Sequence, residues 1–223
     1  MMSTFDVSAY NALPFIAAAN TRFEKQLETA GLTRTQFFTK LVPLFREASY
    51  AGNYSVCLIH RHYSLNDGER MVTTGDSAKP SMDTSENIVG ERWASNGQVI
   101  EHKFTDDPAS HPPPPPAEFF SKFKSIVDAH GVDILGVSYA PGKLEDDFLL
   151  LESPGPGDRE QVTTVVHRLS EERKHGFEAA WIPRFDSKRG FYTMGGCSNC
   201  SPCDCPPPEY RITLQVEKFG ITI

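Results

Sequence analysis

Two histidines, His60 and His62, stand two positions apart in a run of β-branched, aromatic and apolar residues that follows the turn Gly52-Asn53. Such a run is typical of a buried or half-buried strand, so we expect residues 54–65 to form one. Alternate side chains of a strand share a face, and both imidazoles should therefore lie on one side. Neutral imidazole is the commonest metal ligand in proteins, so this pair could bind a metal ion or act in acid-base catalysis.

Glu69 is a further candidate for this site, because it follows the turn Asn66-Asp67-Gly68 and could add a carboxylate. His-x-His with a carboxylate is the ligand set of mononuclear non-haem iron sites. His102 or His167 could complete the site instead, since each alternates with apolar residues in a predicted strand. The alternative is structural: one histidine of the pair would be half exposed, and the other would bond a backbone carbonyl in the core.

A cysteine cluster near the C-terminus is the most specific signal in the sequence. Four of the five cysteines fall within nine residues: Cys197, Cys200, Cys203 and Cys205. Glycines before them and prolines after them predict a loop over residues 195–208. C-x2-C is the standard chelating step for tetrahedral thiolate coordination, so we expect a structural zinc bound by these cysteines, with Cys57 or a histidine as a substitute for one of them.

The cysteine spacing is also similar to the bacterial ferredoxin run C-x2-C-x2-C-x3-C-P, which binds iron-sulfur clusters. The resemblance covers ten residues and departs from the pattern at the last gap, which holds one residue instead of three. An iron-sulfur cluster and a metal-free loop with reactive thiols, which forms disulfides on oxidation, are the alternatives to zinc.

The segment His60-Arg61-His62, with Gly68-Glu69 and Gly75, partly resembles the first motif of the cupin family. Six residues separate His62 from Glu69, where cupins have three or four, and no second motif with Pro-x-Gly and a histidine is present, so no cupin is assigned. The same string with residues 68–72 resembles uncharacterised proteins of filamentous fungi that carry a His-Arg-His strand. That resemblance covers about a twentieth of the chain and implies a eukaryotic protein but no activity.

Length and charge set the class of the protein. A chain of 223 residues can form one domain with a single core, and we expect a single domain over residues 1–223 with a proline-rich loop at 106–116. The net charge of −7 without a block of Lys or Arg argues against nucleic acid and anionic membranes as partners. No apolar run is long enough to span a membrane, and residues 1–20 lack the basic start of a signal peptide, so we expect a cytoplasmic protein. Thiols are kept reduced there, which favours metal binding over disulfides.

The remaining patterns predict helices early in the chain and once in the middle, and strands elsewhere. Helices are expected at 16–30, 34–50 (kinked, or split in two, at Pro43) and 117–130. Short strands are expected at 70–72, 88–93, 99–104, 134–140, 148–152, 161–169, 177–185 and 210–216. The order of elements predicts an α+β fold, with the N-terminal helices and the middle helix packed on a largely antiparallel sheet.

The sequence therefore predicts a soluble metal-binding protein with a structural zinc in the cysteine loop. His60, His62 and Glu69 would form a catalytic site that acts on a small molecule. The alternative is a non-catalytic adaptor that presents the zinc loop and the five prolines at 112–116 to protein partners. An enzyme should direct the two histidines into a concave pocket, whereas an adaptor should leave them buried or scattered.

Overall fold

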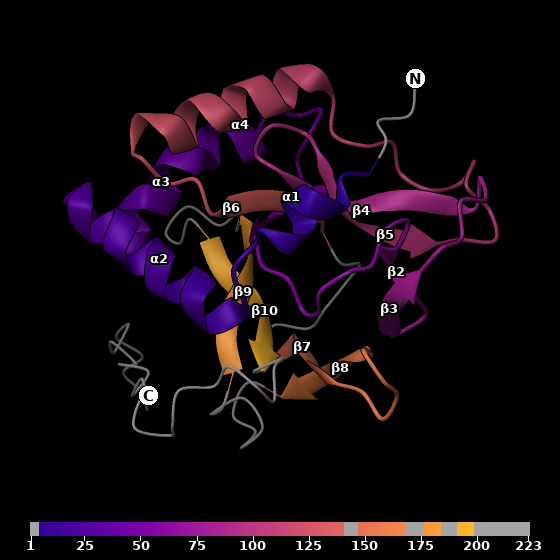
Figure 1. Cartoon of the computed structure of the whole chain (residues 1–223). Coiled ribbons are helices and arrows are strands. Elements are labelled where there is room, and N and C mark those ends of the chain that lie inside the picture. The colour runs from indigo at the N-terminus through magenta and orange to yellow at the C-terminus, as the bar shows by residue number, and fades with distance from the viewer. Residues whose placement is uncertain (1–4, 141–146, 168–175, 184–190, 199–223) are drawn as a thin grey trace.

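The computed structural model describes residues 5–140, 147–167, 176–183 and 191–198, which form ten strands and four helices (Figure 1). The helices are α1 (Val7–Asn11), α2 (Ile16–Thr29), α3 (Arg34–Phe45) and α4 (Ala117–Ala129). The strands are β1 (Tyr54–Leu58), β2 (Arg70–Thr74), β3 (Ser77–Ser81), β4 (Ile88–Ala94), β5 (Val99–Phe104), β6 (Leu135–Tyr139), β7 (Phe148–Pro154), β8 (Gln161–His167), β9 (Gly176–Pro183) and β10 (Phe191–Ser198). None of the helices in these ranges is long and apolar enough to cross a lipid bilayer.

The ten strands close into a barrel in the order β1-β6-β4-β5-β2-β3-β8-β7-β10-β9, with β9 paired to β1. The expected α+β fold, with helices packed on an open sheet, is therefore wrong. Alternation along a strand shows which of its faces is buried, but it does not show which strands pair, so closure has no local signature in the sequence. Most strand pairs are antiparallel, whereas β2–β5 and β7–β10 are parallel.

The barrel has two parts, one formed by the strands β1 to β6 and the other by the strands β7 to β10. The first part is β3-β2-β5-β4-β6-β1, and the second part is β8-β7-β10-β9. The two parts meet at β1–β9 and at β3–β8, and each of these junctions pairs only two residues of one strand with two of the other. The second part, coloured orange to yellow, lies below the first in Figure 1.

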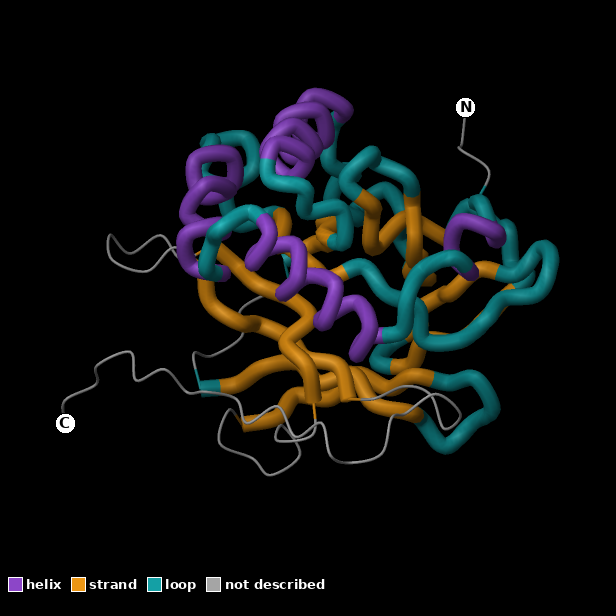
Figure 2. Tube along the Cα trace, turned by 60° about the vertical axis from the view of Figure 1, so that its left-hand side comes forward, coloured by secondary structure: helices purple, strands orange, loops and turns teal. Residues whose placement is uncertain are grey.

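The three longer helices gather on one side of the barrel (Figures 1 and 2). Gly31, with a φ of 66°, ends α2 in the left-handed conformation that glycine adopts without strain. Thr33 and Gln36 form a capping box that starts α3. That helix ends at Phe45, five residues earlier than predicted, and it contains Pro43, which cannot donate a helical hydrogen bond.

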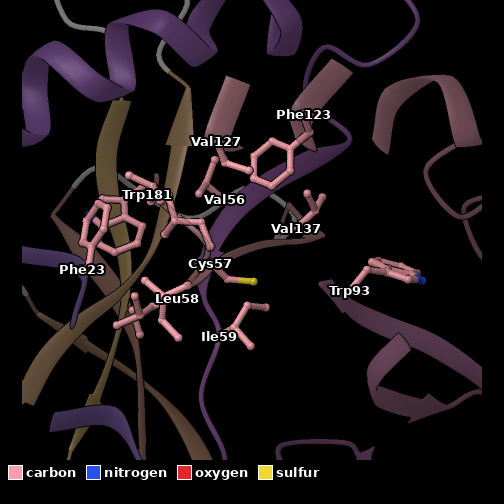
Figure 3. Close-up of a cluster of buried hydrophobic side chains, with 14 of the residues drawn as sticks. Phe23, Val56, Cys57, Leu58, Ile59, Trp93, Phe123, Val127, Val137 and Trp181 are labelled. Carbon is pink, nitrogen blue, oxygen red and sulfur yellow. The ribbon is translucent and has the colours of Figure 1, made fainter. Parts of the chain in front are cut away.

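A large core joins the helices to the barrel (Figure 3). All five side chains of β1 are buried, so this strand has no solvent-facing side. Trp181 of β9 packs against Phe23 and Phe38, with ring centroids 5.9 and 5.0 Å away. Three buried residues of the β7–β8 hairpin form a separate small cluster instead: Leu149, Leu151 and Val166.

Candidate metal centre

His60 and His62 lie together in the segment that follows β1. The strand ends at Leu58, earlier than the predicted 65, and the chain continues with a bridge between Arg61 and Phe15. Both histidine side chains are almost fully buried, at 1% and 2% exposure, and their ring centroids are 4.7 Å apart. The structure therefore brings the two predicted imidazoles into one interior site.

Two further side chains reach this site from distant strands. Glu152 lies on β7 and Cys197 on β10, and the two residues are direct register partners in the parallel pair. Register partners in neighbouring strands point to the same face of a sheet. Each residue of the group offers one ligand atom, and these four atoms lie within 4.8 Å of one another; the group consists of His60, His62, Glu152 and Cys197. This buried group could hold a metal ion.

The spacing of these atoms is close to that of a metal coordination sphere. Glu152 Oε2 lies 3.9 Å from His60 Nε2 and 3.7 Å from His62 Nε2. These separations exceed the length of a hydrogen bond, which is at most about 3.2 Å for N–H···O. Zinc–nitrogen bonds of about 2.0–2.1 Å in a tetrahedron would place neighbouring ligand atoms about 3.3–3.5 Å apart. Movements of a few tenths of an ångström would thus bring these atoms to coordination distance.

His60 has the hydrogen-bonding arrangement of a metal ligand. Its Nδ1 lies 2.8 Å from the carbonyl oxygen of Leu58, which assigns the ring proton to Nδ1 and leaves a lone pair on Nε2. That Nε2 atom is buried and has no hydrogen-bond partner. Metal-bound histidines commonly donate their other ring N–H to a backbone carbonyl in this way, which fixes the orientation of the ring.

An arginine and a second carboxylate complete the charged interior. Arg92 of β4 forms ion pairs with Glu152 and with Glu101 of β5, and the carboxylate of Glu101 lies 3.5 Å from His62 Nε2. Since β4 and β7 are not neighbours in the barrel, Arg92 and Glu152 meet across its interior. Burial disfavours the ionised form of both carboxyl groups, but the charges of Arg92 and His62 outweigh this effect and lower the pKa of Glu101 and of Glu152.

The electrostatics keep His60 neutral. Burial, and after it the neighbouring His62, lower its pKa to about 4. A neutral imidazole near pH 7 has a lone pair that can bind a metal ion without first losing a proton.

Register shifts in two strands help to orient the side chains of the site. The register of β4 shifts on both sides of Arg92, and the register of β10 shifts around Gly195 and Gly196. A β-bulge of this kind turns the side chains that follow it, which is why bulges are frequent beside functional sites. A Cβ atom at Gly196 would lie 3.0 Å from the carbonyl oxygen of Phe177, so the close approach of β9 to β10 next to Cys197 favours a residue without a side chain.

The other predicted site residues lie apart from this group. Glu69 is bound to Arg159 and to the backbone N–H of Asn66, and these hydrogen bonds lower its pKa to about 2. His102 is buried with its ring 5.3 Å from that of Phe5, and it follows Glu101 on β5, so its side chain points to the opposite face. His167 is exposed at the end of β8.

The cysteines fall into three groups. Cys197 belongs to a strand and not to the predicted loop, whereas Cys200, Cys203 and Cys205 lie outside the described residues. Cys57 of β1 is buried, and this burial raises the pKa of its thiol to about 12, which makes it a poor nucleophile (Figure 3).

The predicted proline-rich loop lies against the barrel. Pro112 and Pro113 accept hydrogen bonds through their carbonyl oxygens from the hydroxyl groups of Tyr139 and Tyr54, at 2.7 and 3.3 Å. Residues 112–114 are exposed, Pro115 is buried, and Pro116 caps α4. The run therefore serves as an anchored lead into α4.

The two histidines differ from the arrangement expected of an enzyme and agree in part with that expected of an adaptor. An open groove lies between α1 and the β4–β5 turn, and its lining residues are Phe5–Ser8 and Asn96–Gln98, without either histidine. The histidines are buried, as expected for an adaptor, but they are gathered with other ligand atoms and are not scattered.

Sequence reasoning missed Glu152, Glu101 and Arg92 as members of this site. The signal was present, because each is a charged residue beside large apolar residues within a predicted strand, and a buried charge needs a partner or a metal. Comparisons of the chain with protein-family models, with curated proteins and with solved structures found no match.

Proposed function

We propose that the protein binds one divalent transition-metal ion, with zinc as the first candidate, through His60, His62, Glu152 and Cys197. The observation that carries this proposal is the buried Nε2 atom of His60, which lacks a hydrogen-bond partner and faces a carboxylate 3.9 Å away. A buried lone pair beside an anion is unfavourable unless a cation lies between them.

The charges of the site support a divalent ion. Arg92 supplies one positive charge against the two carboxylates Glu101 and Glu152, and metal binding would add the negative charge of the Cys197 thiolate. A divalent cation would neutralise the two negative charges that then remain. The competing source of positive charge is a protonated His62, which lies between both carboxylates but leaves the lone pair of His60 unused.

The donor atoms support zinc or a similar metal over magnesium and calcium. Two imidazoles, a carboxylate and a thiolate are borderline to soft ligands, whereas magnesium and calcium prefer oxygen. The group contains one cysteine, and an iron-sulfur cluster is usually held by four. Four protein ligands fill a tetrahedral sphere, so we infer a closed structural site and not a catalytic one. A cytoplasmic location, which the sequence predicts, would keep Cys197 reduced.

Metal analysis of protein purified without a histidine tag tests this proposal, because it separates the barrel site from the cysteine loop. We expect one metal ion per chain in the wild type and in the triple variant Cys200→Ser/Cys203→Ser/Cys205→Ser. Loss of the metal is expected in Cys197→Ser and in His60→Ala. Cobalt(II) should give a thiolate-to-metal charge-transfer band that survives in the triple variant. A metal that is lost from the triple variant but kept by His60→Ala would instead assign the site to the loop.

A further inference from the structure

The β7–β8 hairpin is attached to the barrel mainly by short or polar contacts. Its buried apolar residues form their own cluster and are not part of the main core. It pairs with β3 through two residues and with β10 through three, in parallel. Other contacts at its turn are polar, such as the ion pair between Arg159 and Glu69 and the hydrogen bond from Tyr63 to the carbonyl oxygen of Glu160.

The rest of the second part is attached more firmly, through β9. Trp181 packs in the main core, and Glu178 pairs with Arg34 of α3 at 3.0 Å. The parallel pair β2–β5 is as short as the junctions between the two parts, but it lies within the first part, where Met71 is in the main core and Val72 is buried. The β7–β8 hairpin therefore has little apolar anchorage to the main core.

The ligands of the proposed metal site come from both parts of the barrel. His60 and His62 follow β1 of the first part, whereas Glu152 belongs to the hairpin and Cys197 to β10. We propose that the metal ion fastens the β7–β8 hairpin and β10 to the first part of the barrel, so that loss of metal loosens this region ahead of the rest. This inference rests on the proposed metal site.

The consequence is a barrel whose closure depends on metal. One ion would join three chain segments that are separated by about 90 and 45 residues in sequence and that share few strand hydrogen bonds across the two junctions. Without the ion, the contact between Arg92 and Glu152 would be the main interior link that holds the hairpin. We therefore expect the metal-free hairpin to open more often, because its three buried apolar residues pack in a cluster of their own and not in the main core.

Hydrogen exchange of the full chain, measured by mass spectrometry with zinc and after chelation, tests this inference. We expect chelation to speed amide exchange by about tenfold or more in peptides from residues 148–167 and 191–198, and by less than about twofold in residues 54–58 and 117–129. Glu152→Gln in zinc should exchange at least as fast in this region as the chelated wild type, because it loses both a metal ligand and the ion pair with Arg92. Glu160→Gln, which alters the same hairpin away from the site, should still respond to zinc.

The outcomes separate the two proposals. Zinc that binds stoichiometrically but leaves exchange unchanged, or slows it equally in all regions, would overturn the inference and leave the metal site standing. Failure of the protein to bind zinc would overturn both. If Glu152→Gln folds poorly, zinc titration of the chelated wild type gives the same comparison, since protection of the hairpin should rise in proportion to bound metal.

Discussion

Replacement of His60 by leucine should have opposite consequences in the absence and presence of metal. In a chelator, the change removes a buried nitrogen that has no hydrogen-bond partner, which relieves a penalty of about 1–3 kcal/mol. It also removes the hydrogen bond to the Leu58 carbonyl, worth about 0.5–1.5 kcal/mol. The two effects largely offset each other, so the free energy of unfolding of metal-free His60→Leu should stay within about 2 kcal/mol of the wild type.

Zinc should then separate the two proteins. A ligand present at a thousand times its Kd stabilises the folded state by about 4.1 kcal/mol. For a chain of this size, each kcal/mol corresponds to about 2–4 °C, so zinc should raise the Tm of the wild type by about 8–16 °C. His60→Leu should show little of this rise, because it lacks one of the four ligands.

Calorimetry in a chelator and in buffered free zinc measures both effects. His102→Leu is the matched control, because His102 is also buried with a ring nitrogen that has no hydrogen-bond partner, yet it lies outside the ligand group. That variant should keep the full response to zinc. Two results would refute the reasoning: a loss of several kcal/mol by His60→Leu in the chelator, or a response of this variant to zinc equal to that of the wild type.

Three further predictions concern other parts of the barrel. The Cys57 thiol, whose pKa is raised to about 12 by burial, should resist alkylation in the native state and react only on unfolding, as peptide mass spectrometry can show. The hydrogen bond with Arg159 lowers the pKa of Glu69 to about 2, so the stabilisation by Glu69 should be complete above its unfolded pKa of about 4.3 and should disappear as the pH falls towards 2. Glu69→Gln should therefore cost less than about 1 kcal/mol of unfolding free energy at pH 7 and nothing at pH 2, as denaturation measured against pH can show. Gly136→Ala would place a Cβ atom against the backbone carbonyl of Trp93, so urea denaturation should show a loss of about 1–3 kcal/mol or more. Gly52→Ala is the control, because its Cβ atom would contact no neighbour and the change should cost only the strain of a positive φ.

Local patterns predicted most of the elements but not their assembly. The strands predicted at 88–93 and 99–104 are present as β4 and β5, and Asn96-Gly97 lies in the turn between them, where a glycine at a φ of 85° suits a hairpin. The strand β3 was missed, since its sequence Ser-Ala-Lys-Pro-Ser lacks the apolar and β-branched residues on which the prediction depends. The closed order of the strands depends on contacts between residues far apart in the chain, and periodicity along one strand does not specify them.

The candidate site shows the same division between local and distant information. His60 and His62 were identified as a pair because their chemistry and spacing are visible within three residues. Glu69 was assigned to them because it is near in sequence, yet the carboxylate that reaches them comes from Glu152, about 90 residues later. Cys197 was grouped with its three neighbours in sequence, whereas in the structure its register places it beside Glu152.

Cys197 fits both a zinc-binding loop in the sequence and a buried strand position in the structure. In sequence it begins a C-x2-C step, but it is also the next-to-last residue of β10, and its side chain is fully buried. A thiolate in that place needs a positive charge, because the described residues of the site pair two carboxylates with one arginine. A metal ion shared with His60 would supply this charge at the point where the two parts of the barrel face each other. The chemistry of the site and the closure of the fold are therefore expected to depend on the same ion, and a chelator should affect both together.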